Sequence, residues 1–174
     1  LGTDYVFDGK KGFYTESDPA NPLGVYARHK LEAEQEIVKA NIDHLICRIT
    51  NVYGNEIRGK NFISRLSDNM QKGEAMELNL PVDQYASPVN AADVARAIFE
   101  LVSNEKSVLY HFASTDYLNR VQLAERVQSY FGHEQVIINS VNTEHLNQPA
   151  KRPLIGGMSA VKFNSEFPDF RWTN

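Results

Sequence analysis

The sequence lacks the features that mark several classes of protein. Only one of its 174 residues is a cysteine, Cys47, so no internal disulfide can form. This fits a reducing compartment, and we expect a cytoplasmic location. Cys47 lies in an apolar run, where a buried packing role is expected. No apolar run approaches the roughly 20 residues that a membrane-spanning helix needs, and residues 1–5 lack the charged and apolar regions of a signal peptide. We therefore expect no membrane partner.

Basic runs, metal-ligand spacings and a glycine-rich phosphate loop are also missing. The net charge is −4, which argues against nucleic acid as a partner. The five histidines and the single cysteine show no metal-ligand spacing, so no metal site is expected. No G-x-x-G-x-x-G pattern is present, and nothing in these residues corresponds to the phosphate cradle that such a loop makes for a dinucleotide.

What is present predicts an α/β fold. The length suits one domain or part of a larger one. Residues 1–7 and 44–50 are predicted as strands on either side of a helix over residues 23–40, with Asn21 as its cap and Pro22 at its first position. This order is a βαβ unit with parallel strands. Further helices are predicted at about 61–71, 90–102, 120–131 and 159–165, and further extended segments at 75–80, 85–89, 108–113 and 136–138.

Tyr26 and Lys30 lie four residues apart in the first turns of the predicted helix. Side chains at this spacing share one helix face. The ammonium can favour the ionised form of the phenol, which makes the tyrosine a useful proton donor and acceptor. By itself, a Tyr-x-x-x-Lys pair in a chain with eight tyrosines is more often an ordinary helix-surface contact.

The surroundings of the pair support a chemical role. Ligands of open parallel sheets sit outside the carboxyl ends of the strands, and Thr3 and Asn51 lie at or near two such ends. A hydroxyl, a tunable phenol and a cation are what a carbonyl needs as it becomes an alcohol. No side chain donates a hydride, so a nicotinamide cofactor is implied.

Several motifs resemble one family over nearly the whole chain. They are Gly2-Thr-Asp-Tyr-Val-Phe-Asp-Gly9, Tyr14-x-Glu16-x-Asp18-Pro19-x-Asn21-Pro22-Leu23-x-x-Tyr26-x-x-x-Lys30-x-x-x-Glu34, Arg48 with Val52-Tyr-Gly54, Gly59-Lys-Asn-Phe62, Asp83-Gln84 with Ser87-Pro88, Asp93-Val-Ala95 and Lys151-Arg-Pro153. Together they resemble the extended short-chain dehydrogenase/reductases, and within them the dTDP-4-dehydrorhamnose reductases. The resemblance implies NAD(P)H-dependent reduction of a 4-keto nucleotide sugar in deoxysugar biosynthesis.

The resemblance also implies roles for residues at the reacting centre. Tyr26 would be the general acid, and Thr3 would orient the substrate carbonyl. Lys30 would assist Tyr26 and hold the nicotinamide ribose. Asn51 and Val52 would border the cofactor, which would be NADPH or NADH.

Five further residues are implied to bind the nucleotide-sugar substrate: Asp4, Tyr5, Asn61, Gln84 and Arg152. The guanidinium fork of Arg152 suits a pyrophosphate, although a surface arginine is an equal reading. The resemblance leaves a homodimer open.

Two departures from the family pattern matter. Rhamnose reductases usually carry an aromatic residue just before Val-Tyr-Gly, where this chain has Asn51, as many sugar-nucleotide epimerases do. Complete members are longer and begin with the glycine-rich cofactor half. We therefore expect a C-terminal fragment of a Rossmann-like parallel sheet plus a small α/β substrate-binding lobe. Residues 1–54 would be the Rossmann remnant with the catalytic helix and residues 55–174 mainly the lobe, with about 85–113 returning to the sheet. The isolated fragment is expected to be inactive.

Two alternatives stay open on the sequence. One is a nucleotide-sugar epimerase or dehydratase with the same Thr3, Tyr26 and Lys30, which Asn51 favours. The other is a non-catalytic regulatory relative, similar to the β subunit of methionine adenosyltransferase. The intact catalytic residues argue mildly against it.

Overall fold

A parallel sheet of three strands carries the first part of the chain. The computed structural model describes residues 1–132 and 136–173. β1 (Gly2–Thr3), β2 (Leu45–Ile49) and β7 (Val108–Phe112) pair in the order β1–β2–β7, all parallel. Their carboxyl ends meet at one edge, because Thr3 lies opposite Ile49 and Ile49 opposite Phe112. α1 (Val25–Lys39) connects β1 to β2 and so forms the predicted βαβ unit.

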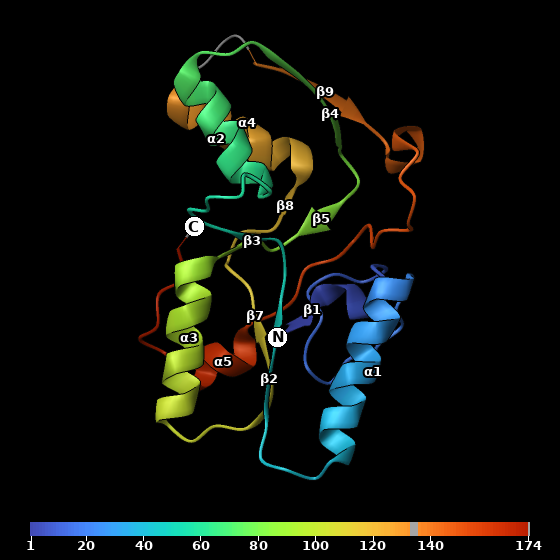
Figure 1. The fold of residues 1–174 in the computed structure, drawn as a ribbon, viewed down its shortest axis with the longest axis vertical. Coiled ribbons are helices and arrows are strands. Elements are labelled where there is room, and N and C mark those ends of the chain that lie inside the picture. Colours follow the sequence, from blue (N-terminus) through green and yellow to red (C-terminus); the bar gives the residue numbers. More distant parts are fainter. Residues whose placement is uncertain (133–135, 174) are drawn as a thin grey trace.

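Helices lie on both sides of this sheet. In Figure 1, α1 stands to one side of β2 and β7, while α3 (Ala91–Ser103) and the short α5 (Val161–Glu166) stand to the other. Apolar side chains of β2, β7, α3 and α5 form one buried cluster, which includes Cys47, Leu101, Phe112 and Phe163. The predicted packing role of Cys47 is confirmed, and burial raises the pKa of its thiol to about 11.

A second group of elements packs above the sheet in Figure 1. It contains α2 (Phe62–Lys72), α4 (Arg120–Phe131), β4 (Met76–Pro81) and β9 (Val136–Val141), with β4 and β9 paired in parallel along their full length. Their side chains form a separate buried cluster. The short pairs β3 (Val52–Tyr53) with β6 (Val89–Asn90), and β5 (Tyr85–Ala86) with β8 (Leu118–Asn119), lie between the two groups.

Local capping explains where α2 and α4 begin and end. The side chain of Asn61 accepts hydrogen bonds from the first turn of α2, and Asn119 forms a capping box with Gln122 at the start of α4. Gly73 and Gly132 end these helices in the left-handed conformation. Both predicted helices are confirmed to within one residue.

Two predictions for the N-terminal region are wrong. The strand predicted over residues 1–7 is paired only at Gly2–Thr3, because Thr3 then caps the 3-10 helix η1 (Asp4–Val6). The helix predicted from Leu23 begins at Val25, and Gly24 rather than Asn21 is its N-cap. The Asn21 backbone N–H instead donates to the carbonyl oxygen of Val6, and its side chain donates to Asp8.

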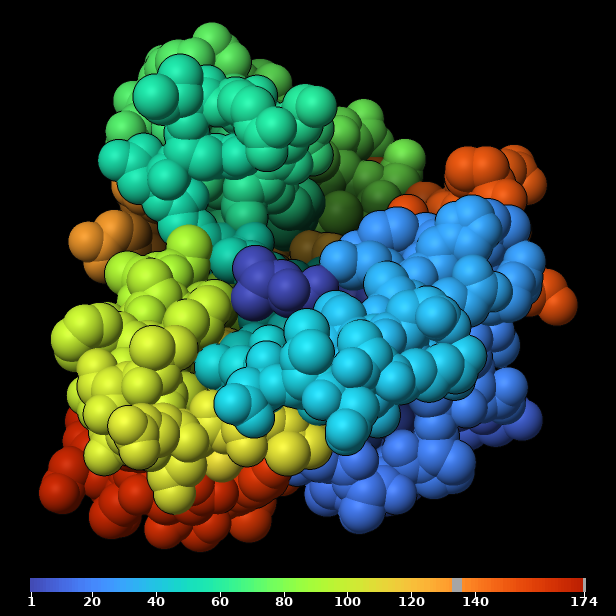
Figure 2. Space-filling model, turned by 60° about the horizontal axis from the view of Figure 1, so that its bottom comes forward, coloured from blue at the N-terminus to red at the C-terminus, as the bar shows by residue number. Residues whose placement is uncertain are grey.

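The surface shows where the chain's first residues lie. In Figure 2 they are exposed between the atoms of α1 and those of α3, below the second group of elements. Leu1 is accordingly exposed. A second 3-10 helix, η2 (Thr143–Leu146), follows β9. None of the described helices is long and apolar enough to cross a bilayer.

Candidate active site

The carboxyl ends of β1 and β2 are joined by hydrogen bonds. Thr3 and Asp4 are both buried. The Thr3 hydroxyl accepts from the backbone N–H of Tyr5 at 3.3 Å, and the Thr50 hydroxyl, just beyond β2, donates to the Asp4 carboxylate at 2.7 Å. This corner is therefore fixed by contacts between neighbouring strand ends.

Burial raises the pKa of Asp4 to about 6, and hydrogen bonds from Thr50 and Thr3 offset only part of that effect. The bond from the Thr3 hydroxyl to Asp4 is long, at 3.4 Å, which makes it weak. The Thr3 hydroxyl hydrogen is thus held only weakly by Asp4.

Tyr26 and Lys30 face the same corner from the first two turns of α1. Tyr26 is 59 % exposed, and its ring meets that of Tyr5 edge-on with 6.4 Å between centroids. The Lys30 ammonium donates to the Leu1 carbonyl oxygen at 2.7 Å. A cavity of about 300 Å³ brings together seven predicted site residues: Thr3, Asp4, Tyr5, Tyr26, Lys30, Asn51 and Val52.

A second cavity, of about 260 Å³, shares Tyr5 and Tyr26 with the first. It lies between residues 23–27 and residues 150–153, so Arg152 lines it. The Arg152 guanidinium donates to the Tyr5 hydroxyl at 3.0 Å and lies 5.3 Å from the centre of its ring.

A narrow polar gap continues from Asp4 and Tyr5 toward the second group of elements. Asn51, Gln84 and Arg120 line it. Asn51 has a φ of 34°, in the left-handed region, and its side-chain oxygen accepts from Arg120 at 3.1 Å. The Gln84 amide donates to Thr143 at 2.9 Å.

Asn61 is the one predicted site residue that lines none of these three spaces. Its side-chain oxygen caps α2 by accepting from Ile63 at 2.9 Å, and its amide donates to the Val52 carbonyl oxygen. It therefore supports the segment that borders the cavity.

Sequence reasoning missed Arg120 and Thr50. Thr50 follows a predicted strand directly, so its position at a strand end could have indicated it. Arg120 reaches the gap from the first residue of α4, and no local pattern links that helix start to Asn51, 69 positions earlier.

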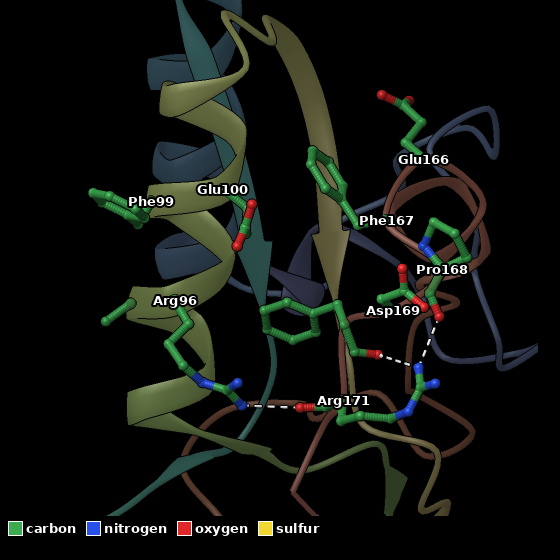
Figure 3. A pocket seen from close by; sticks show the side chains of 10 residues that line it. Arg96, Phe99, Glu100, Glu166, Phe167, Pro168, Asp169 and Arg171 are labelled. Atoms are coloured by element: carbon green, nitrogen blue, oxygen red, sulfur yellow. Dashed lines mark hydrogen bonds between the residues drawn. The ribbon is translucent and has the colours of Figure 1, made fainter.

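A larger groove of about 850 Å³ lies between α3 and residues 166–171 (Figure 3) and contains none of the predicted site residues. Both arginines of the groove are already engaged. Arg96 pairs with Asp93 at 2.5 Å and donates to the Arg171 carbonyl oxygen at 2.9 Å. The Arg171 guanidinium donates to the carbonyl oxygens of Pro168 and Phe170 at 2.7 and 3.2 Å. We therefore keep the candidate active site at the carboxyl ends of β1 and β2 rather than in this groove.

Parallel strands with helices on both sides, and cavities at the strands' carboxyl ends, define a Rossmann-like α/β protein. The predicted fold class is thereby confirmed, in agreement with solved structures. The model of the RmlD substrate binding domain matches residues 1–173, and the chain belongs to that family.

Individual relatives agree with the predicted resemblance. A dTDP-4-dehydrorhamnose reductase of Sinorhizobium fredii is 29 % identical over 96 % of this chain and 59 % of its own length. The crystal structure of a dTDP-4-dehydrorhamnose reductase from Clostridium acetobutylicum superposes with a TM-score of 0.87 at 26 % identity, covering 98 % of this chain and 59 % of that one. The chain thus spans about three-fifths of the length of these relatives.

Two further proteins are similar to the chain. The dTDP-4-dehydrorhamnose reductase of Bacillus anthracis, solved in complex with NADP, shares the fold with a TM-score of 0.87 at 24 % identity, over 99 % of this chain and 60 % of that one. The methionine adenosyltransferase 2 subunit beta of Bos taurus is 26 % identical over 90 % of this chain and 46 % of its own length.

Proposed function

We propose that this chain supplies the catalytic tyrosine and the substrate-binding part of an NAD(P)H-dependent reductase of a 4-keto nucleotide sugar, of the extended short-chain dehydrogenase/reductase type. The observation that carries the proposal is the single cavity lined by Thr3, Tyr26 and Lys30 at the carboxyl ends of β1 and β2. The family membership and the reductase of Sinorhizobium fredii support a nucleotide sugar such as dTDP-4-dehydrorhamnose as the ligand.

The chain's own residues suit the nicotinamide end of the cofactor. Tyr26 and Lys30 present a hydroxyl and an ammonium for a ribose, and Val52 adds an apolar contact beside Asn51 in the same cavity. When bound, the nicotinamide supplies the hydride that a keto sugar needs. The cofactor is NADPH or NADH in this proposal, and the Bacillus anthracis reductase was solved with NADP.

Three side chains handle the substrate carbonyl in this proposal. The Thr3 hydroxyl donates to the carbonyl oxygen and orients it. Tyr26 gives its phenolic proton to that oxygen as the alcohol forms, and the Lys30 ammonium stabilises the phenolate that is left. The exposure of Tyr26 fits a group that meets a ligand rather than the protein core.

The substrate would extend away from Tyr26 along both neighbouring spaces. Asp4 and Tyr5 lie beside the sugar, while Gln84 and Arg152 reach the nucleotide part. Asn61 acts through the Val52 carbonyl that it holds. We propose that residues 1–54 form the cofactor side and residues 55–174 mainly the substrate lobe, with β7 returned to the sheet. A cytoplasmic location and a homodimer stay predictions.

Asn51 supports a second candidate function. A polar residue at this position favours an epimerase or dehydratase with the same catalytic residues. A non-catalytic role like that of the methionine adenosyltransferase β subunit is weaker, because a pure binding protein has no need of Thr3, Tyr26 and Lys30 around one cavity.

The test is an assay of the complete gene product with dTDP-4-keto-6-deoxyhexose and NADPH, followed by the absorbance of the reduced cofactor. Tyr26→Phe should lower kcat by roughly 10²- to 10⁴-fold, the range for loss of a general acid, and leave substrate binding intact. Tyr130→Phe, an exposed tyrosine on α4, is the matched control. Near-wild-type turnover by Tyr26→Phe would show that the acid is wrongly assigned, and consumption of the keto sugar without oxidation of NADPH would favour the epimerase.

A further inference from the structure

Thr50 is a buried side chain to which the proposed reaction assigns no role. It directly follows β2 and is 1 % exposed. Its hydroxyl donates to Oδ2 of Asp4 at 2.7 Å. Thr50 lines neither the cavity of Tyr26 nor the gap beside Arg120, so any effect that it has on a ligand there passes through Asp4.

The two oxygens of the Asp4 carboxylate are held unequally. Oδ2 accepts from Thr50 at 2.7 Å, whereas Oδ1 accepts from the Thr3 hydroxyl at 3.4 Å. Hydrogen bonds from a hydroxyl to an oxygen are normally about 2.5–3.0 Å long, so the bond from Thr50 is normal and the bond from Thr3 is weak. Thr50 therefore holds the carboxylate toward the end of β2.

The single hydrogen of the Thr3 hydroxyl has two possible acceptors in the proposed reaction. The Thr3 oxygen already accepts from the backbone N–H of Tyr5 at 3.3 Å, and a hydroxyl donates only once. The hydrogen therefore goes either to Asp4 or to the substrate carbonyl. Hydrogen bonds to an ionised acceptor are roughly twice as strong as those between neutral groups, so an ionised Asp4 that could turn toward Thr3 would take the hydrogen.

The charge of Asp4 changes in an accessible pH range. Burial raises its pKa to about 6, although hydrogen bonds from Thr50 and Thr3 and the charge of Arg120 act in the opposite direction. Among the described residues that line the two spaces beside it, Asp4 is the only carboxylic acid, and no histidine lines them. The other titratable side chains there are Tyr5 of the same segment, Tyr26 and Lys30 of α1, Tyr85 of β5 and Arg120 of α4.

We propose that Thr50 is a positioning residue, which holds the Asp4 carboxylate toward β2 and so leaves the Thr3 hydroxyl able to donate to the substrate carbonyl. The inference rests on the role given to Thr3 in the proposed function. In Thr50→Val the ionised carboxylate turns to Thr3 and takes its hydrogen, so the carbonyl loses a donor. Protonation of Asp4 ends this competition, because a neutral carboxyl is a weaker acceptor and can itself donate to the Thr3 oxygen.

The test compares kcat of the complete gene product, wild type and Thr50→Val, for the keto sugar with NADPH. Near pH 8, where Asp4 is ionised, Thr50→Val should lower kcat by roughly tenfold or more, within the range for loss of one donor to the reacting oxygen. Near pH 5, where Asp4 is mostly neutral, it should lie within about threefold of wild type. The ratio to wild type at each pH removes the titration of Tyr26. An equal loss at both pH values, or no loss, overturns the proposal.

Three variants support the interpretation. Thr50→Ser keeps the hydroxyl and should follow wild type at both pH values. Thr50→Ala also lacks the hydroxyl and should reproduce the pH dependence even if Thr50→Val does not fold. Thr15→Val is the matched control, because it breaks another threonine-to-aspartate bond, 2.8 Å long to Asp18, outside the cavities of the site. It should leave kcat unchanged.

A measurement without turnover separates this inference from the proposed function. Carbon-13 NMR titration of the Asp4 carboxyl reports its pKa in each variant. Thr3→Val should raise that pKa by roughly one pH unit in the Thr50→Val background, as for loss of a hydrogen bond to a charged group, and by much less in the wild type. Equal changes in the two backgrounds overturn the proposal. If the NMR result is as expected but no keto sugar is reduced, the proposed function fails and the control of Thr3 by Thr50 stands.

Discussion

At the scale of single residues, Asp4 and His111 are two buried groups. Burial shifts the pKa of each so that its neutral form is favoured. Burial raises the pKa of Asp4 to about 6. Burial, followed by the charge of Arg48, lowers the pKa of His111 to about 4. Nδ1 of His111 lies 3.0 Å from the Tyr14 carbonyl oxygen, and Nε2 lies 3.4 Å from Arg48. The neutral tautomer that donates from Nδ1 and accepts at Nε2 satisfies both contacts.

These two groups should make opposite contributions to stability as the pH falls from about 6.5 to about 4. Between pH 6.5 and 4, His111 is protonated in the unfolded state but neutral in the folded state. Acidification over this range therefore lowers the free energy of unfolding. Asp4 becomes protonated in the folded state near pH 6, well before it does so in the unfolded state. Acidification therefore raises the free energy of unfolding through Asp4. Each effect is about 3 kcal/mol, at 1.36 kcal/mol per pKa unit, and the two nearly cancel in the wild type.

Single variants should separate the two effects. Relative to wild type, Asp4→Asn should lose about 3 kcal/mol of unfolding free energy between pH 6.5 and 4, and His111→Gln should gain a similar amount. Urea denaturation at a series of pH values measures both. His29→Gln, an exposed histidine on α1, should follow the wild-type curve. Curves that stay parallel for all three variants would contradict the assigned shifts.

The residue scale also shows what the sequence could reveal about the site. Tyr26 and Lys30 could be paired because helix geometry alone puts them on one face, and the structure places both in one cavity with Thr3. Arg120 could not be found, since its partner Asn51 is brought to it by the packing of α4 against other elements. Local spacing predicts neighbours along one element, but contacts between elements depend on the whole fold.

At the scale of elements, the same distinction explains which boundaries were predictable. α2 and α4 begin and end at residues that carry their own capping chemistry, Asn61 and Gly73 in one case and Asn119 and Gly132 in the other. The start of α1 was mispredicted because the backbone and side chain of Asn21 are engaged by Val6 and Asp8. Because of these tertiary contacts, Asn21 does not cap α1.

One buried ion pair ties α1 to the sheet. Arg48 of β2 donates to Glu34 of α1 at 2.6 Å, and both side chains are buried. Arg48→Met should destabilise the fold by about 3–5 kcal/mol, because it leaves Glu34 as an uncompensated buried charge. Chemical denaturation monitored by circular dichroism measures the loss.

Two further variants identify the cause. Glu34→Leu combined with Arg48→Met removes both charges, so it should recover most of the lost stability. Lys39→Met breaks an exposed pair with Glu36 on the same helix and should cost less than about 1 kcal/mol. A double variant no more stable than Arg48→Met alone would assign the loss to packing instead of charge.

At the scale of the whole molecule, the candidate site lies where distant parts of the chain meet. Asp4 and Asn51 come from the ends of β1 and β2, Gln84 precedes β5, Arg120 begins α4, and Arg152 belongs to the C-terminal segment. The residues proposed to contact the substrate therefore come from segments spread over nearly the whole of these 174 residues. Tyr26, Lys30, Asn51 and Val52, the residues proposed to border the cofactor, line one cavity, and the sequence contains no glycine-rich phosphate-loop pattern.

This asymmetry leads to a prediction about the 174-residue chain itself. Backbone N–H groups of a glycine-rich loop and the following helix supply much of the grip on a dinucleotide's phosphates, so calorimetry should detect no micromolar binding of NADPH. dTDP should still bind, because Gln84 and Arg152, which we propose to contact the nucleotide, are both present, and this binding also serves as the control for correct folding. Micromolar affinity for NADPH would mean that the side chains around Tyr26 hold the cofactor without a phosphate loop, and the division into cofactor and substrate sides would then be wrong.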